Sequence, residues 1–124
     1  MTMFSYEEPP YCYAIKSIVK YIDGDTIDVI LDLGFHIHIQ KRIRLYGINT
    51  PETRTRDKVE KKKGLEAKER LIAMCEGEEL GESNLILKCH GLGKYGRVLG
   101  TIYNNNCNVN RMLVLEGYAV EYLP

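Results

Sequence analysis

Three short segments carry side chains that could hydrolyse a phosphodiester, and they follow one another along the chain. They are Asp23-Gly24-Asp25-Thr26, residues 44–52 (Arg-Leu-Tyr-Gly-Ile-Asn-Thr-Pro-Glu) and Lys94-Tyr95-Gly96-Arg97. Aspartates can hold a divalent cation, arginines can bind a phosphate that gains negative charge, and a glutamate can take a proton from water. The order and spacing of the three segments together predict a metal-dependent phosphodiesterase.

Each segment alone has a simpler interpretation. An Asp-Gly pair is a common turn signal, and Thr50-Pro51-Glu52 is typical of the start of a helix or a turn. An arginine on the polar face of a strand, such as Arg44, is usually solvated. One aspartate such as Asp25 is also too few ligands for calcium, which takes several oxygens. The functional interpretation therefore requires the segments to meet.

In that interpretation each group has a distinct task. Asp25 and the backbone carbonyl of Thr50 would face one cation, and Glu52 would lie beside the attacking water. Arg44 and Arg97 would contact the phosphate from opposite sides. Further candidates for substrate contact are Lys94 and Tyr95, because a tyrosine can bind the phosphate or lie against a base.

Composition limits the class of protein. The 124 residues suit one domain with a single core, and 44% of them are hydrophobic. The formal net charge is zero, so a purely electrostatic DNA-binding protein is not expected. We expect no contact with a membrane, because no stretch approaches spanning length.

The four cysteines, Cys12, Cys75, Cys89 and Cys107, lack the spacing of a zinc site, and we expect reduced thiols. Acids and prolines occupy the N-terminal stretch where a signal peptide would be apolar. These features favour a cytoplasmic or other intracellular location.

The elements that must position these groups are mainly strands. Alternating or apolar runs predict strands at residues 11–19, 26–33, 35–46, 85–90 and 98–103. In the third of these, the odd positions from Phe35 to Leu45 are expected to face inward. The pattern predicts helices at Leu65–Cys75, with Leu65 on the buried stripe, and at Val109–Glu116. Gly77 and Gly81 would end the first helix.

This order of elements is typical of an α+β, mainly β fold. It predicts a five-stranded Greek-key barrel of the OB type, with a helix after the third strand and another near the C-terminus. Residues 1–10 are expected to form a flexible arm, and residues 11–124 the single domain.

Two further groups of residues have both a functional and a plain interpretation. Residues 53–63 form a mostly basic stretch that is either a solvated loop or a local patch for a polyanion. Its candidate substrate contacts are Arg54, Arg56, Lys62 and Lys63. His36 and His38 are two residues apart, which suits a metal, but without a third ligand solvated histidines are favoured.

With these residues assembled, the chain resembles the staphylococcal nuclease (thermonuclease) family over roughly Tyr13 to Val120. The matching motifs are Asp-Gly-Asp-Thr, Arg-Leu-x-Gly-x-x-Thr-Pro-Glu, the Gly64-Leu65-Glu66-Ala67 helix entry and Lys-Tyr-Gly-Arg, followed by the 109–117 pattern. The resemblance implies an OB-type barrel and calcium-dependent cleavage of DNA and RNA that leaves 3′-phosphate ends.

The resemblance also implies roles for individual residues. Asp25 would be a calcium ligand, Thr50 would give its carbonyl, and Asp23 would be an acid in the outer shell of the metal. Glu52 would be the general base, and Arg44 and Arg97 would bind the scissile phosphate. We also consider Tyr122 a candidate for nucleotide contact.

One departure from the family pattern concerns the metal. Asn49 stands where the family usually has aspartate, so two carboxylate ligands have become one. We expect a weaker or altered affinity for Ca²⁺, which leaves room for another divalent cation.

The sequence therefore predicts a calcium-dependent endonuclease of low sequence specificity that acts on DNA or RNA, with single strands favoured. The alternative is a barrel that binds single strands or a protein partner without cutting. Retention of Arg44, Glu52 and Arg97 favours the enzyme, whereas Asn49 favours the binding module. We expect a monomer, with a dimer as the alternative.

Overall fold

The computed structural model describes residues 11–77 and 84–122 of the chain. Five strands form a closed barrel: β1 (Cys12–Asp23), β2 (Thr26–Asp32), β3 (His38–Leu45), β5 (Leu85–Leu92) and β6 (Val98–Asn104). Neighbouring strands follow the order β3-β2-β1-β5-β6, and a parallel pairing of β3 with β6 closes the circle. The prediction of an α+β, OB-type barrel is confirmed. The predicted arm at residues 1–10 and the helix-ending role of Gly81 lie outside the described residues.

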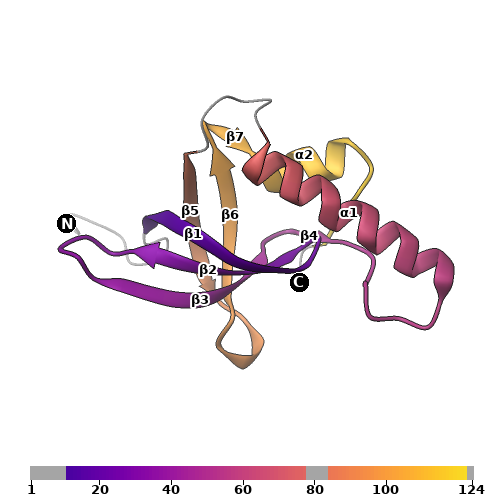
Figure 1. Cartoon of the computed structure of the whole chain (residues 1–124), viewed down its shortest axis with the longest axis horizontal. Coiled ribbons are helices and arrows are strands. Elements are labelled where there is room, and N and C mark those ends of the chain that lie inside the picture. The colour runs from indigo at the N-terminus through magenta and orange to yellow at the C-terminus, as the bar shows by residue number, and fades with distance from the viewer. Residues whose placement is uncertain (1–10, 78–83, 123–124) are drawn as a thin grey trace, which may run out of the picture.

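The remaining elements lie around the barrel. Helix α1 (Lys58–Glu76) and helix α2 (Val109–Leu115) lie on one side of it, as Figure 1 shows, and a short helical turn η2 (Lys94–Gly96) joins β5 to β6. The two-residue strand β7 (Cys107–Asn108) extends the sheet beside β6. A separate pair, β4 (Ile48–Asn49) and β8 (Val120–Glu121), ties the C-terminal stretch to the segment that follows β3. No helix among the described residues is long and apolar enough to cross a membrane.

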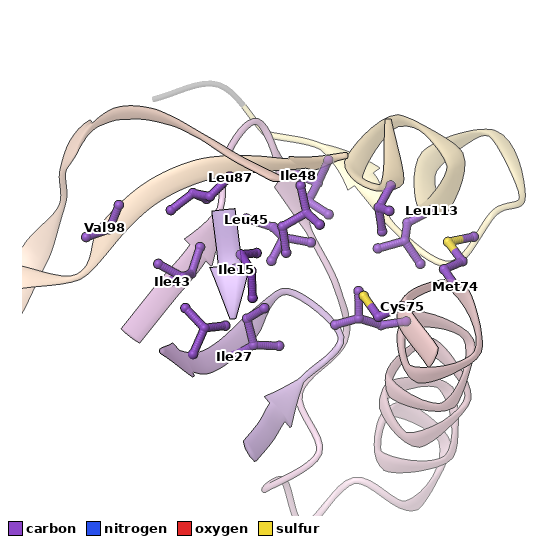
Figure 2. Close-up of a cluster of buried hydrophobic side chains, with 14 of the residues drawn as sticks. Ile15, Ile27, Ile43, Leu45, Ile48, Met74, Cys75, Leu87, Val98 and Leu113 are labelled. Atoms are coloured by element: carbon purple, nitrogen blue, oxygen red, sulfur yellow. The ribbon is translucent and has the colours of Figure 1, made fainter. Parts of the chain in front are cut away.

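The core fills the barrel and continues beneath the helices. Side chains from the strands, such as Ile27, Leu45 and Ile48, face Met74 and Leu113 from the two helices (Figure 2). Ile27, Leu45 and Leu113 are at most 1% exposed, so the barrel and the helices share one apolar core. That shared core fixes the helices against the strands that carry the candidate catalytic residues.

The third strand is shorter than the sequence pattern predicts. Its predicted start, Phe35 and His36, lies instead in a turn, where Gly34, Phe35 and His36 all have positive φ. Phe35, Ile37 and Ile39 were expected to face inward, but they are 94%, 55% and 37% exposed. The barrel closes against β6 only from Ile43 onward, so the earlier half of the hairpin has no layer to cover it.

The first helix is longer than predicted. Its first two turns are charged and carry no apolar stripe, so the sequence pattern did not reveal them. It begins after Asp57, whose carboxylate caps the helix by accepting hydrogen bonds from the N–H groups of Val59 and Glu60. Half of the predicted basic loop is therefore helical. Its buried residues are Gly64, Ala67, Leu71, Met74 and Cys75. Leu65 is 41% exposed, so its predicted place on the buried stripe is wrong.

Asn110, in the first turn of α2, contacts the turn after β3 and two residues of β6. Its amide group donates to the carbonyls of Tyr46 (2.9 Å) and Gly100 (3.1 Å) and accepts from the N–H of Ile102 (3.2 Å). The side chain is 4% exposed, so water cannot replace these bonds when the amide is removed. Asn110 thereby holds the turn after β3 against β6.

We predict that Asn110→Ala lowers the free energy of unfolding by about 3 kcal/mol, because the backbone groups of Tyr46, Gly100 and Ile102 each lose one hydrogen bond. Urea denaturation measures the loss. Asn108→Ala is the matched control: it removes the cap of α2, a single bond to the N–H of Arg111, and should cost about 1 kcal/mol. Equal losses in the two variants would contradict the joining role of Asn110.

None of the four cysteines forms a disulfide bond, and they differ in exposure. Cys75 is one of the buried residues of α1, and its burial raises the pKa of its thiol to about 12. We predict that Cys12, Cys89 and Cys107 react with a thiol reagent in the native protein at pH 8, and that Cys75 reacts only after unfolding. Reaction of four thiols at one rate in the folded protein would contradict the buried position of Cys75.

Candidate active site

The register of β3 between its two neighbours brings the three sequence segments together. Arg44 pairs with Thr26 of β2 on one side and with Leu99 of β6 on the other. Thr26 follows Asp25, and Leu99 lies two residues after Arg97. One position on β3 therefore lies between the aspartate turn and the end of the Lys94–Arg97 segment.

Asp25 is the buried acid of this region. The residue is 6% exposed, and its carboxylate accepts hydrogen bonds from the hydroxyl of Thr26 (3.0 Å) and from the backbone N–H of Thr50 (3.0 Å). Its Oδ2 also lies 3.3 Å from Nη2 of Arg44. A buried carboxylate requires such partners, and here they come from β2, β3 and the segment after β4.

Arg44 connects the acid to Asn49. The same Nη2 that contacts Asp25 donates to Oδ1 of Asn49 (3.3 Å), while Nη1 donates to the carbonyl of Leu45 (2.9 Å). Pairing of Asn49 with Val120 of β8 fixes the backbone of the asparagine. The guanidinium is thus held in one orientation by three oxygen atoms.

The segment that carries Glu52 is held from two sides. On one side, Asp23 accepts hydrogen bonds from the N–H (3.2 Å) and the hydroxyl (2.5 Å) of Thr53. On the other side, α1 packs so closely that a Cβ added at Gly64 would lie 2.6 Å from the carbonyl oxygen of Glu52. Asp23 therefore positions this segment directly, and its predicted place in the outer shell of a metal stays a prediction.

Glu52 itself projects from this fixed segment. Its side chain is exposed, and within the described part of the chain it makes no hydrogen bond or ion pair. Glu52 lies three residues after Asn49, which contacts Arg44. It does not line either of the two grooves that contain Arg97. Its carboxylate is available to accept a proton from water.

Two grooves meet at Arg97. The first, of about 320 Å³ and here called the Arg44 groove, is lined by polar residues Arg44, Asn49, Lys94, Arg97 and Tyr122, together with apolar residues that include Leu99. The second, of about 510 Å³ and here called the Arg42 groove, has Asp23, Thr26, Arg42, Tyr95 and Arg97 on its walls. Arg97 lines both, and its Nε donates to the carbonyl of Lys94 (3.2 Å). Two arginines, Arg44 and Arg97, thus share one groove.

The other candidate residues are distributed unevenly. Lys94 and Tyr122 line the Arg44 groove, whereas Tyr95 lines the other. Arg54 and Arg56 are exposed between Glu52 and α1, and Lys62 and Lys63 are exposed on α1; none of these four lines either groove. His36 and His38 are exposed at the β2–β3 hairpin, where no group of three metal-binding side chains occurs among the described residues.

Sequence reasoning missed two residues of this region. Thr53 fixes the Glu52 segment through Asp23, and its only signal was its position directly after Thr-Pro-Glu. Arg42 lines the second groove and is paired with Asp28, whose carboxyl pKa it holds below the usual value through their hydrogen bond. The signal for that pair was that both residues lie on polar faces of adjacent predicted strands.

Comparison with known proteins agrees with this arrangement. The family model described as "Staphylococcal nuclease homologue" matches residues 42–123. The chain belongs to this family. It is also 31% identical over 123 residues to "Protein ParB" of Escherichia coli. That alignment covers 92% of this chain and 60% of ParB, so the chain spans well under two thirds of its relative.

The resemblance to the nuclease family implies a calcium ion, and the local oxygen atoms suit a hard cation. Asp25 offers a carboxylate and Asn49 an amide oxygen, and the hydroxyl oxygen of Thr50 is buried with no hydrogen-bond partner in the described structure. It is the N–H of Thr50 that contacts Asp25. The set carries one negative charge, and Arg44 already contacts two of these oxygens. The residues fit a weakly held cation.

We predict that Asn49→Asp tightens binding of Ca²⁺ at least tenfold, because it restores a second carboxylate beside Asp25. Isothermal titration of the wild type and the variant measures the change. Asn108→Asp, which adds the same charge at the cap of α2, is the control and should leave the affinity unchanged. Equal affinities for all three proteins would show that this position does not contact the cation.

Proposed function

We propose that this domain is a divalent-cation-dependent nuclease that hydrolyses phosphodiester bonds of DNA or RNA with little sequence specificity, leaving 3′-phosphate ends. The observation that carries the proposal is that the guanidinium of Arg44 is held on the Asp25 carboxylate in the groove that Arg97 also lines. Membership of the nuclease family supports the reaction class. The preferred ion would be Ca²⁺, with another divalent cation as the alternative.

The two arginines are suited to a phosphate that gains charge. Arg44 is oriented by Asp25, Asn49 and the carbonyl of Leu45, and Arg97 by the carbonyl of Lys94. Guanidinium groups that are already oriented need little rearrangement as negative charge develops in the transition state. Arg44 is half-buried on the barrel wall, which strengthens its attraction to the phosphate.

Glu52 is the candidate general base. It is exposed and close in sequence to Asn49, and Asp23 with Thr53 fixes the backbone beside it. It would take the proton of the water that attacks phosphorus, while the leaving 5′-oxygen takes up a proton from solvent. The cation, held by Asp25 and Asn49, would add positive charge next to the phosphate when bound.

The dimensions of the Arg44 groove support a single-stranded substrate. Its volume of about 320 Å³ suits one nucleotide rather than a duplex, and Tyr122 and Lys94 line it. The exposed residues Arg54, Arg56, Lys62 and Lys63 would add attraction for the remaining backbone that depends on salt concentration.

One observation favours a second function. The described residues contain no group of three histidine, cysteine, aspartate or glutamate side chains that could hold a metal, and Asn49 contributes no charge. A domain with such a site could bind single strands in the same groove without cutting them. The two functions use the same binding surface. Only the nuclease needs Glu52, which would act as the general base.

We predict that the purified domain cleaves single-stranded DNA or RNA with Ca²⁺ and not with a chelator. Glu52→Gln should slow cleavage about 100-fold or more, because it removes the base, and should leave binding of the oligonucleotide unchanged. Arg44→Ala should weaken both cleavage and binding. A gel assay with end-labelled oligonucleotides measures the rate and the type of end.

Glu60→Gln, which neutralises a carboxylate on the first turn of α1, is the matched control and should cleave at the normal rate. Cleavage by Glu52→Gln at the wild-type rate would overturn the role of Glu52. Binding without cleavage by the wild type in any divalent cation would favour the binding module.

A further inference from the structure

The Arg42 groove adjoins the Arg44 groove, because Arg97 lines both. A phosphate bound by Arg44 and Arg97 would therefore border the Arg42 groove, and the nucleotide next to it could enter that groove. The volume of about 510 Å³ is large enough for a nucleoside.

Arg42 presents a fixed flat surface to this groove. Its Nε and Nη2 donate to the two carboxylate oxygens of Asp28 at 2.8 and 3.1 Å, which fixes the plane of the guanidinium. The side chain is still 52% exposed. Because Asp28 balances the charge of Arg42, the guanidinium offers the groove a stacking surface more than a net positive charge.

Tyr95 supplies an aromatic ring to the same groove. The ring is 97% exposed, and the backbone of Tyr95 has left-handed geometry with φ 59° and ψ 27°. Left-handed geometry is unfavourable for a bulky residue and is typical of functional sites. The turn between β5 and β6 thus exposes the aromatic ring of Tyr95 to solvent and does not bury it in the core.

The charges of the groove favour a base over a second phosphate. Asp23 lies on its wall, and its carboxylate would repel a phosphate. Stacking surfaces with little net charge suit a nucleobase, because every base has a flat face. The hydroxyl of Thr26 could donate or accept a hydrogen bond with a base, and the carboxylate of Asp23 could accept one.

We propose that the Arg42 groove is a second nucleotide subsite, in which the base next to the scissile phosphate stacks on Arg42 and Tyr95. The proposal rests on the proposed function for the position of the phosphate at Arg44 and Arg97. The ligand is a nucleobase of a single strand, and Asp28 acts as a positioning residue for the guanidinium.

Binding of fluorescein-labelled tetranucleotides tests the subsite, with Glu52→Gln as the background so that the ligand stays intact. Arg42→Ala and Tyr95→Ala should each weaken binding about tenfold, the usual worth of a stacked base. Arg42→Lys should weaken binding similarly, because lysine keeps the charge and loses the plane. Arg111→Ala, a guanidinium that lines neither groove, is the control and should bind normally.

Tetranucleotides with one abasic position locate the base. One of these ligands should lack the base that normally stacks on Arg42. It should bind the Arg42→Ala protein as tightly as the background protein, because there is no base for Arg42 to stack on. Normal binding by Arg42→Lys would overturn stacking, and normal binding by Arg42→Ala would overturn the subsite. Thermal melting of each variant confirms that the barrel is intact.

The outcomes separate this proposal from the nuclease proposal. If the wild type cleaves and the Arg42 variants bind normally, the nuclease proposal stands and the subsite is wrong. If the wild type binds without cleaving and Arg42→Ala weakens binding, the subsite stands and the hydrolytic proposal is wrong.

Discussion

The geometry of the candidate site depends on the burial of one carboxylate. Asp25 is almost inaccessible to water, so its charge must be satisfied by protein groups. Those groups are the hydroxyl of Thr26, the N–H of Thr50 and the guanidinium of Arg44. Meeting this single requirement fixes the start of β2, the end of β3 and the segment that leads to Glu52. The burial of Asp25 therefore accounts for the convergence of residues that lie far apart in the sequence.

The same contact limits the metal chemistry of the site. The positive charge next to Asp25 in the structure is Arg44, and Asn49 adds an oxygen without a negative charge. A divalent cation at these oxygens would lie close to the guanidinium of Arg44, which would repel it. This repulsion would lower the affinity for the cation further than the missing carboxylate alone does. The negative charge of a bound phosphate would attract both the guanidinium of Arg44 and the divalent metal ion. In the proposed nuclease, the ion and the substrate would therefore strengthen each other's binding.

The sequence predicted the family and most of the elements because those features depend on local patterns. Alternation marked β2, and Gly77 and Gly117 mark helix ends in the structure as they do in the sequence. The exposed half of the β2–β3 hairpin could not be predicted, because the apolar residues Phe35 to Ile39 alternate as buried strands do. The charged start of α1 was missed because its cap at Asp57 acts without an apolar stripe. The contacts of Thr53 and Arg42 depend on how distant segments pair in the folded chain, which cannot be determined from a single sequence.

The most direct test of this account is the structure of the Glu52→Gln protein with Ca²⁺ and a short single-stranded oligonucleotide. The account predicts one phosphate within hydrogen-bond distance of both Arg44 and Arg97, with the cation between that phosphate and Asp25. An oligonucleotide that lies along the exposed lysines of α1 and leaves both arginines without a phosphate would contradict it.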